Sequence, residues 1–220
     1  MKVLVLCGDY WHPAEVIRRG LSYLNETGAE KYEFDFVEDA KDLLTPEYIS
    51  QYPVIINAKM DEITGGNQNP WFEKGVTEVQ PADLQAYVEK GGGFIALHAG
   101  NSYFADKTPE YVDFVGNAFV RHPARCDVKI KIVEENPITE GVTDFVVRDE
   151  HYEIDHLASD RKTFMMSESA TGGLQTAGYI REIGEGRLCV LTPGHILSVY
   201  THPEFQKLLC NAIAWCAGEK

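Results

Sequence analysis

The chain has 220 residues, of which 44% are hydrophobic and 25% charged, as is ordinary for a globular protein with a substantial core. Twenty basic and thirty-four acidic side chains give a net charge of −14, which would repel nucleic acid and anionic membranes but suits a small neutral substrate. The apolar run at the start is too short for a secretion signal, and no other run could cross a membrane. The five cysteines are odd in number and lack CxxC spacing, so we expect reduced thiols in a cytoplasmic protein.

The first half of the chain predicts strands and helices in alternation. Apolar runs at 1–7, 53–58 and 94–97 predict buried strands, and the alternation of apolar and acidic residues at 32–36 predicts a half-buried one. Between them, apolar residues at helical spacing follow Pro13, Pro46 and Pro81, each suited to the first turn of a helix. This order is typical of a doubly wound, mainly parallel sheet with helices on both faces.

The pattern changes in the second half. A short helix is expected over 109–114, and the alternation of apolar and polar residues at 126–133 is typical of an edge or antiparallel strand. Segments 177–183 and 187–191 flank a Gly-Glu-Gly turn and predict an added antiparallel hairpin. A final amphipathic helix begins at Pro203. Since no repeat or linker is present, we predict a single domain over 1–220.

The stretch 91–100, GGGFIALHAG, joins a glycine run, a short buried strand and a histidine flanked by small residues. In parallel α/β sheets, ligands bind at the carboxyl ends of strands, where a sharp strand-to-helix turn exposes one reactive side chain. We expect that exposed side chain to be His98.

Two more histidines, His12 and His195, also follow predicted strands, so the three should meet at one edge of the sheet. Neutral imidazoles in such a cluster would ligate a transition metal, with Glu150 or Asp9 completing the site. Alternatively, the same histidines would exchange protons as general acid and base beside Glu150. The residues leave both interpretations open.

Four further residues are candidates for substrate binding. Tyr152 lies on the same side as Glu150 if their segment is extended. His122 occupies an Arg-His-Pro turn, and Trp11 and Trp71 lie in loops near the predicted edge, where they would stack on the face of a sugar.

The triplet His202-Pro203-Glu204 matches the His-Pro-Glu of glutamine amidotransferases, whose histidine activates a cysteine at the strand-to-helix turn. Here that position is His98, so there is no thiolate to activate. We therefore interpret the triplet as the start of the last helix.

Several segments together resemble the ThuA-like (trehalose utilisation) family: 91–100, 136–142, 149–153, 186–195 and the final helix over 203–218. One departure is Thr192-Pro193-Gly194-His195, where Thr-Leu-Gly-His would be expected. The resemblance implies a flavodoxin-like, class I glutamine amidotransferase-like fold without the amidotransferase cysteine. It also implies a role in the catabolism of trehalose, other disaccharides or their 3-keto derivatives.

The leading hypothesis is therefore a cytoplasmic isomerase, lyase or hydrolase acting on a small sugar by His/Glu acid–base chemistry. The residues assigned to it are His98, His195 and Glu150 as catalytic groups, with His12, His122, Tyr152, Trp11 and Trp71 as binding groups. A divalent metal held by His12, His98 and His195 in a hydrolase is the first alternative, and a non-catalytic sugar-binding or regulatory module is the second. No nucleic-acid or membrane partner is expected, and homodimerisation is expected only because dimers are common.

Overall fold

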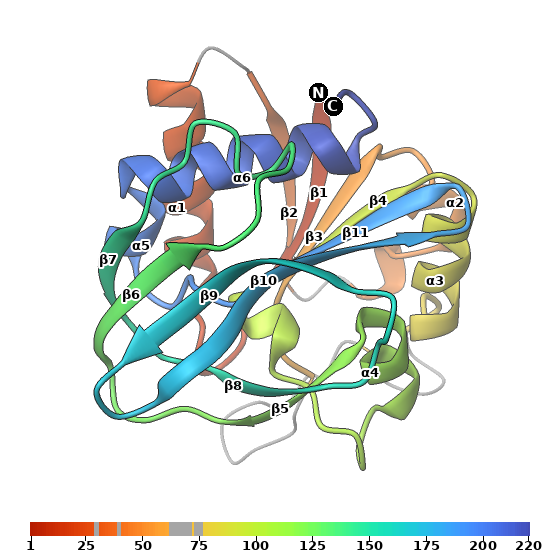
Figure 1. Cartoon of the computed structure of the whole chain (residues 1–220). Helices are drawn as coiled ribbons and strands as arrows, with labels where there is room; N and C mark the ends of the chain where they lie inside the picture. Colours follow the sequence, from red (N-terminus) through yellow and green to blue (C-terminus); the bar gives the residue numbers. More distant parts are fainter. Residues whose placement is uncertain (29–30, 39–40, 62–71, 73–76) are drawn as a thin grey trace.

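The computed structural model describes residues 1–28, 31–38, 41–61, 72 and 77–220 (Figure 1). Its strands are β1 (Lys2–Cys7), β2 (Glu33–Val37), β3 (Val54–Ala58), β4 (Gly93–Leu97), β5 (Asn117–Arg121), β6 (Cys126–Ile132), β7 (Phe145–Asp149), β8 (Glu153–His156), β9 (Lys162–Ser169), β10 (Gly173–Ile183) and β11 (Gly186–Leu191). Its α-helices are α1 (Ala14–Thr27), α2 (Pro46–Ile49), α3 (Pro81–Glu89), α4 (Pro109–Val115), α5 (Leu197–Tyr200) and α6 (Pro203–Cys216), with 3-10 turns η1 (Lys41–Leu43) and η2 (His98–Asn101).

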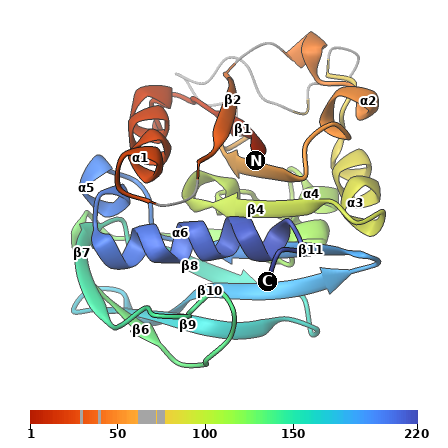
Figure 2. The same cartoon turned by 90° about the horizontal axis from the view of Figure 1, so that it is seen from above.

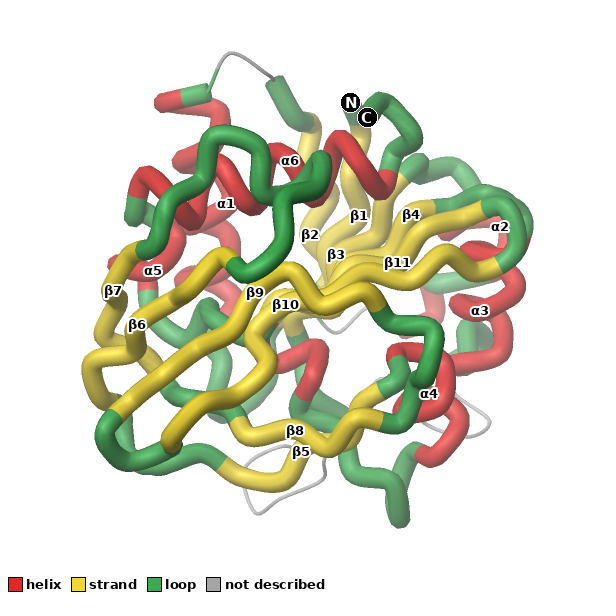
Figure 3. Tube along the Cα trace, in the orientation of Figure 1, coloured by secondary structure: helices red, strands yellow, loops and turns green. Residues whose placement is uncertain are grey.

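The main sheet has nine strands in the order β2-β1-β3-β4-β11-β10-β9-β6-β7 (Figure 3). Strands β2, β1, β3, β4 and β11 pair in parallel, in the order typical of flavodoxin-like folds with β11 in fifth place. The predicted α/β class and the β10–β11 hairpin are both confirmed. The antiparallel part goes further than the hairpin, because β9, β6 and β7 continue the sheet beyond β10.

Helices cover both faces of the parallel part (Figure 2). In β1, successive side chains point to opposite faces, so Val3 and Val5 pack against α1 and α6, whereas Leu4 and Leu6 pack against the α2, α3 and α4 side. Strands buried on both faces read as continuous apolar runs, which explains the sequence of β1, β3 and β4.

A separate two-stranded antiparallel sheet, β5–β8, was not expected from the sequence. The chain leaves the main sheet at the end of β7 and enters this small sheet at the start of β8. Residues 150–152 form the connection, and Glu150 within it lies 3.5 Å from His98, which directly follows β4.

Two further sequence-based expectations concern the described residues. All five cysteines are thiols rather than disulfides. Among the helices that the structure describes, none is both long and apolar enough to span a bilayer.

Candidate functional site

The strand-end histidines come together at one edge of the sheet. His12 follows β1, His98 begins η2 directly after β4, and His195 follows β11. Glu150 reaches the same point from the connection between β7 and β8. Donor atoms of these four side chains lie within 4.8 Å of one another. The sequence prediction that the histidines share one edge therefore agrees with the geometry.

His98 has the left-handed backbone conformation (φ 44°), which is uncommon for any residue other than glycine. Its Nδ1 donates a hydrogen bond to the Thr192 carbonyl at 2.8 Å, so Nε2 is the atom turned toward the cluster. The expectation that His98 is exposed is wrong. The residue is only 1% exposed because this turn directs the ring beneath Tyr152, at a centroid distance of 4.4 Å.

His12 is oriented by a carboxylate. Its Nδ1 lies 2.9 Å from both oxygens of Asp9, and Asp9 also accepts backbone N–H bonds from Trp11, His12 and Met60. An Nδ1 proton donated to Asp9 leaves the Nε2 lone pair directed at the cluster. Sequence analysis offered Asp9 as a direct ligand, but the structure places it behind His12 as its hydrogen-bond partner.

The position of His195 is fixed through its backbone. Asp149, the last residue of β7, is buried and accepts hydrogen bonds from the Gly194 N–H at 2.7 Å and the His195 N–H at 3.0 Å. Gly194 has φ 141°, and a Cβ there would lie 2.9 Å from the Tyr200 hydroxyl and 3.1 Å from the His98 Cβ. The turn after β11 therefore requires glycine.

Glu150 contacts three imidazoles. Its Oε2 lies 3.2 Å from His195 Nδ1, 3.5 Å from His98 Nε2 and 3.5 Å from His122 Nε2. Although burial raises the pKa of Glu150, hydrogen bonds to His195 and His98 outweigh it, and the pKa lies well below its usual range. Glu150 is therefore a carboxylate at neutral pH.

The surroundings of His98 and His12 shift their pKa values in opposite directions. Burial lowers the pKa of His98, but Glu150 and Asp149 overcome this effect and raise the pKa above its ordinary value. Burial lowers the pKa of His12, and the partial compensation by Asp9 does not restore it. His12 thus favours the neutral form, in which it can act as a ligand, more than His98 does.

A pocket of about 420 Å³ opens above the cluster. His12, His195, Glu150, Tyr152 and His122 all line it, whereas His98 lies behind this wall. The Tyr152 hydroxyl is 3.2 Å from His98 Nε2 and 3.5 Å from His12 Nε2, and burial raises the pKa of Tyr152 so that it stays protonated.

The predicted aromatic residues divide into two cases. Trp11 is 53% exposed and lines the pocket, as expected for a side chain available to a ligand. Trp71 lies outside the described residues. Sequence reasoning did not single out Phe104 and Phe119, which also line the pocket, because nothing local distinguishes them from core residues.

Asp149 was also missed as an individual residue. The signal available was its place in the polar run 148–153, which ends an alternating strand. Alternation puts Asp149 on the buried side of β7, but its contact with the turn after β11 depends on strands distant in sequence.

Two other histidines make structural contacts, and for His202 this agrees with the helix start interpreted from the sequence. His151 is buried between the hydroxyls of Ser169 at 2.7 Å and Ser167 at 2.9 Å. His202 caps α6, its Nδ1 accepting the Glu204 N–H at 3.2 Å, which supports the reading of His202-Pro203-Glu204 as a helix start.

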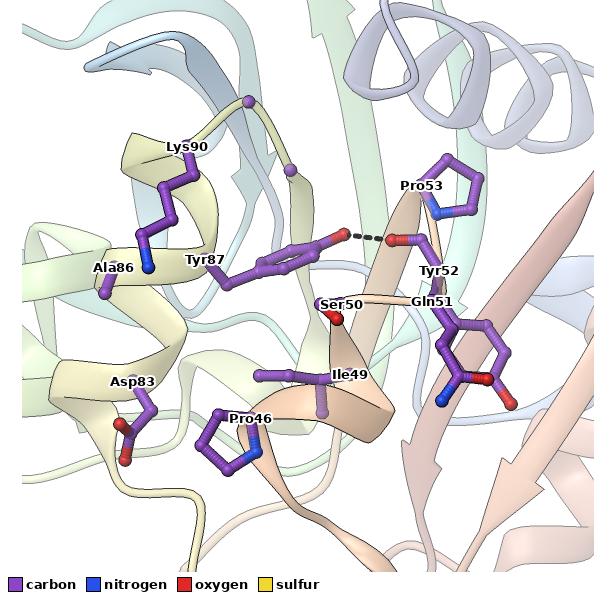
Figure 4. Close-up of a pocket in the computed structure, with 12 residues that line it drawn as sticks. Pro46, Ile49, Ser50, Gln51, Tyr52, Pro53, Asp83, Ala86, Tyr87 and Lys90 are labelled. Carbon is purple, nitrogen blue, oxygen red and sulfur yellow. Dashed lines mark hydrogen bonds between the residues drawn. The ribbon is translucent and has the colours of Figure 1, made fainter.

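A second cavity, of about 380 Å³, lies between α2 and α3 at the opposite edge, beside the start of β3 and β4 (Figure 4). Its floor is closed by the Tyr87 hydroxyl, which donates to the Tyr52 carbonyl at 2.8 Å. Asp83 and Lys90 are the charged residues among those described at its wall, and they come from two ends of one helix. It therefore lacks the converging polar groups of the histidine pocket.

The comparison that decides the family is a match to the ThuA model, described as trehalose utilisation, over residues 2–216. The chain belongs to the ThuA family. This confirms the resemblance noted in the sequence and supports a carbohydrate-related role. No curated protein matches significantly.

Solved structures agree with this assignment. A ThuA-like protein of Parabacteroides merdae is similar with a TM-score of 0.77 and 18% identity, over 100% of this chain and 91% of the other. A ThuA-like protein of Bacteroides uniformis gives 0.75 and 18%, over 98% and 91%. A β-galactosidase of Rahnella sp. R3 gives 0.66 and 13%, over 97% of this chain but 30% of the enzyme. At these identities, the likenesses show the fold alone.

Proposed function

We propose that this ThuA family protein is a carbohydrate-active enzyme whose reaction centre is a divalent metal ion held by His12, His98, His195 and Glu150. The observation that carries the proposal is the convergence of their four donor atoms from separate segments of the chain.

The distances within the cluster match a metal site. His98 Nε2, His195 Nδ1 and Glu150 Oε2 are separated by 3.3, 3.2 and 3.5 Å. Ligand atoms about 2.1 Å from a tetrahedral ion lie about 3.4 Å apart, so these three atoms already approximate one face of the tetrahedron. Three imidazoles and one carboxylate suit zinc and neighbouring first-row metals.

The hydrogen bonds around the cluster support the same function. Histidines that bind metals usually donate their other ring N–H to a carboxylate or a carbonyl. His12 has such a partner in Asp9, and His98 has one in the Thr192 carbonyl. Both rings are therefore oriented with Nε2 facing the cluster before any ion arrives.

The burial of His98 distinguishes a ligand from a direct acid or base. A general acid or base must come within hydrogen-bond reach of the substrate. His98 lies behind the pocket wall, beneath Tyr152, where it reaches the cluster but not the cavity. We therefore assign His98 to the metal rather than to the substrate.

A bound ion would polarise a carbonyl or hydroxyl oxygen of the substrate, or lower the pKa of a coordinated water. The residues of the chain supply the rest. His122 donates Nδ1–H to the Pro123 carbonyl at 2.9 Å, which leaves Nε2 facing the pocket and Glu150 for proton exchange. Tyr152 is placed to donate a hydrogen bond, and Trp11 to stack on a sugar face.

A second candidate is acid–base catalysis without a metal. It is favoured by a continuous series of polar atoms from the Tyr152 hydroxyl to His98 Nε2 at 3.2 Å, His195 Nδ1 at 3.3 Å and Glu150 Oε2 at 3.2 Å. Such a series would move protons next to the carbonyl of a keto-sugar, by isomerisation or elimination, or assist hydrolysis of a glycoside.

The test is metal analysis combined with a substrate survey. Protein purified without an affinity tag is analysed for metals and incubated with disaccharides and their 3-keto forms, with and without added zinc, and products are identified by mass spectrometry. We expect about one metal ion per chain, its loss with the product on chelation, and loss of both in His98→Ala and His195→Ala. His156→Ala, outside the pocket, is the matched control.

Each outcome separates the candidates. Turnover that survives complete metal removal contradicts the metal centre and favours the acid–base candidate. Saturable sugar binding with no product under any condition contradicts both and indicates a binding or regulatory module. Activity of this kind would take place in the cytoplasm, as the odd number of cysteines and their lack of CxxC spacing suggest.

A further inference from the structure

The pocket has a positively charged group that the proposed reaction centre does not use. We propose that the substrate is an anionic sugar, whose carboxylate or phosphate group binds Arg125 at the pocket wall while its hydroxyl or carbonyl oxygens face the histidine cluster. This inference rests on the proposed function, since it concerns the ligand of the same pocket.

Arg125 is an exposed residue that lies just before β6. It is the one arginine or lysine among the described residues that line the pocket. Within the described part of the chain, it has no hydrogen-bond or ion-pair partner. Arg121, at the end of β5, is instead paired with Glu153 at 2.7 Å. The guanidinium of Arg125 is therefore available to a ligand.

The charge balance of the pocket favours an anion at this place. Glu150 is the one carboxylate among the described lining residues, and three imidazoles already contact it. The net charge of −14 repels anions from the surface as a whole, and Arg125 supplies a local cation that opposes this repulsion at the pocket. The planar guanidinium binds carboxylate or phosphate oxygens through two parallel hydrogen bonds, which a neutral hydroxyl cannot match.

The remaining walls fit the rest of such a molecule. Trp11, Phe104 and Phe119 give the pocket aromatic faces, with the two phenylalanine rings in an edge-to-face contact at 5.6 Å. Aromatic faces pack well against apolar C–H surfaces. A volume of about 420 Å³ is within the range of small-ligand sites. The pocket lining thus combines one arginine, three aromatic side chains and residues of the histidine cluster.

The test measures binding, so it does not depend on knowing the reaction. Zinc-loaded protein is titrated by calorimetry with D-glucose, D-glucuronate and D-glucose 6-phosphate, which share a ring and differ in charge. The proteins compared are the wild type, Arg125→Ala, Arg125→Lys and the control Arg19→Ala, which removes another exposed arginine, on α1 and outside the pocket.

We expect the wild type and Arg19→Ala to bind one of the anionic sugars about tenfold more tightly than glucose, with a preference that weakens at high salt. Arg125→Ala should reduce the preference to within about twofold, and Arg125→Lys should retain part of it. Selection of glucuronate or of glucose 6-phosphate identifies the anionic group as carboxylate or phosphate.

The inference is overturned if glucose binds as tightly as the anionic sugars, if the preference survives in Arg125→Ala, or if none of the three binds. Metal content is measured on the same samples. A stoichiometric ion without anionic preference would therefore reject this inference and leave the proposed metal centre in place, whereas absence of the ion would count against the centre itself.

Discussion

The contact between Asp9 and His12 gives the sharpest test of the proposed centre. Asp9→Asn keeps the size of the side chain but replaces one oxygen with an NH₂ group. Because Oδ2 faces both the Met60 N–H at 3.0 Å and His12 Nδ1 at 2.9 Å, the new donor would oppose Met60 and donate to the ring. The retained oxygen still lies 2.9 Å from Nδ1, but the new donor beside it makes the tautomer with its proton on Nε2 more favourable, and Nε2 is the atom that must be free to bind an ion.

The expected losses of zinc affinity and of stability follow from the effects of comparable hydrogen bonds in other proteins. Loss of a carboxylate behind a metal-binding histidine lowers metal affinity about 10- to 100-fold, or about 1.4–2.7 kcal/mol. An unsatisfied Met60 N–H would lower the free energy of unfolding by about 1–3 kcal/mol, and the melting temperature by about 2–12 °C. The two effects are separable, since only the first changes binding to the folded protein.

Zinc affinity is measured by competition with a chromophoric chelator, and folding by circular dichroism, for the wild type, Asp9→Asn and Asp127→Asn. Asp127 is exposed on β6 and serves as the matched control. If Asp9→Asn remains folded and binds zinc within twofold of the wild type, the tautomer of His12 does not control the site and our reading of the Asp9 contact is wrong.

Three other predictions concern ligand linkage, backbone geometry and thiol burial. Zinc at about 100 times its dissociation constant should add about 2.7 kcal/mol to the free energy of unfolding and raise the melting temperature of the chelator-treated protein by about 5–11 °C; no shift in a thermal scan would argue against binding by the folded state. Gly194→Ala, with φ 141° and contacts at 2.9 and 3.1 Å, should lower the melting temperature by several degrees and weaken zinc binding, and a fully wild-type variant would contradict the requirement for glycine. Burial raises the pKa of the Cys7 thiol to about 12, so about one molecule in ten thousand carries the thiolate at pH 8. Iodoacetamide should therefore label the partly exposed Cys126 but not Cys7 in the native protein, as measured by peptide mass spectrometry. Rapid labelling of Cys7 would disprove its burial.

The parallel half of the fold was predictable because its signals are local. Continuous apolar runs identify β1, β3 and β4, and a proline in the first turn marks α2, α3 and α4. Since parallel strands end at a common edge, the positions of His12, His98 and His195 followed from the strand ends alone.

The rest of the site depends on pairings that no local pattern encodes. Strands β5 and β8 pair across distant segments, and this pairing carries Glu150 to the histidines. The burial of His98 depends on a left-handed backbone conformation, and nothing in the sequence around this histidine predicts that conformation. Arg125 stands out only because it lines the pocket and has no partner among the residues that the structure describes.

The position of Glu150 in a different region of the fold from the histidines has a consequence for how the protein unfolds. His12, His98 and His195 follow parallel strands, whereas Glu150 belongs to the connection between the antiparallel extension and the small sheet. An ion shared by all four would act as a cross-link between these regions. Hydrogen exchange should then show β6, β7 and β9 opening independently in the metal-free protein, and opening together with the parallel core once the metal is bound.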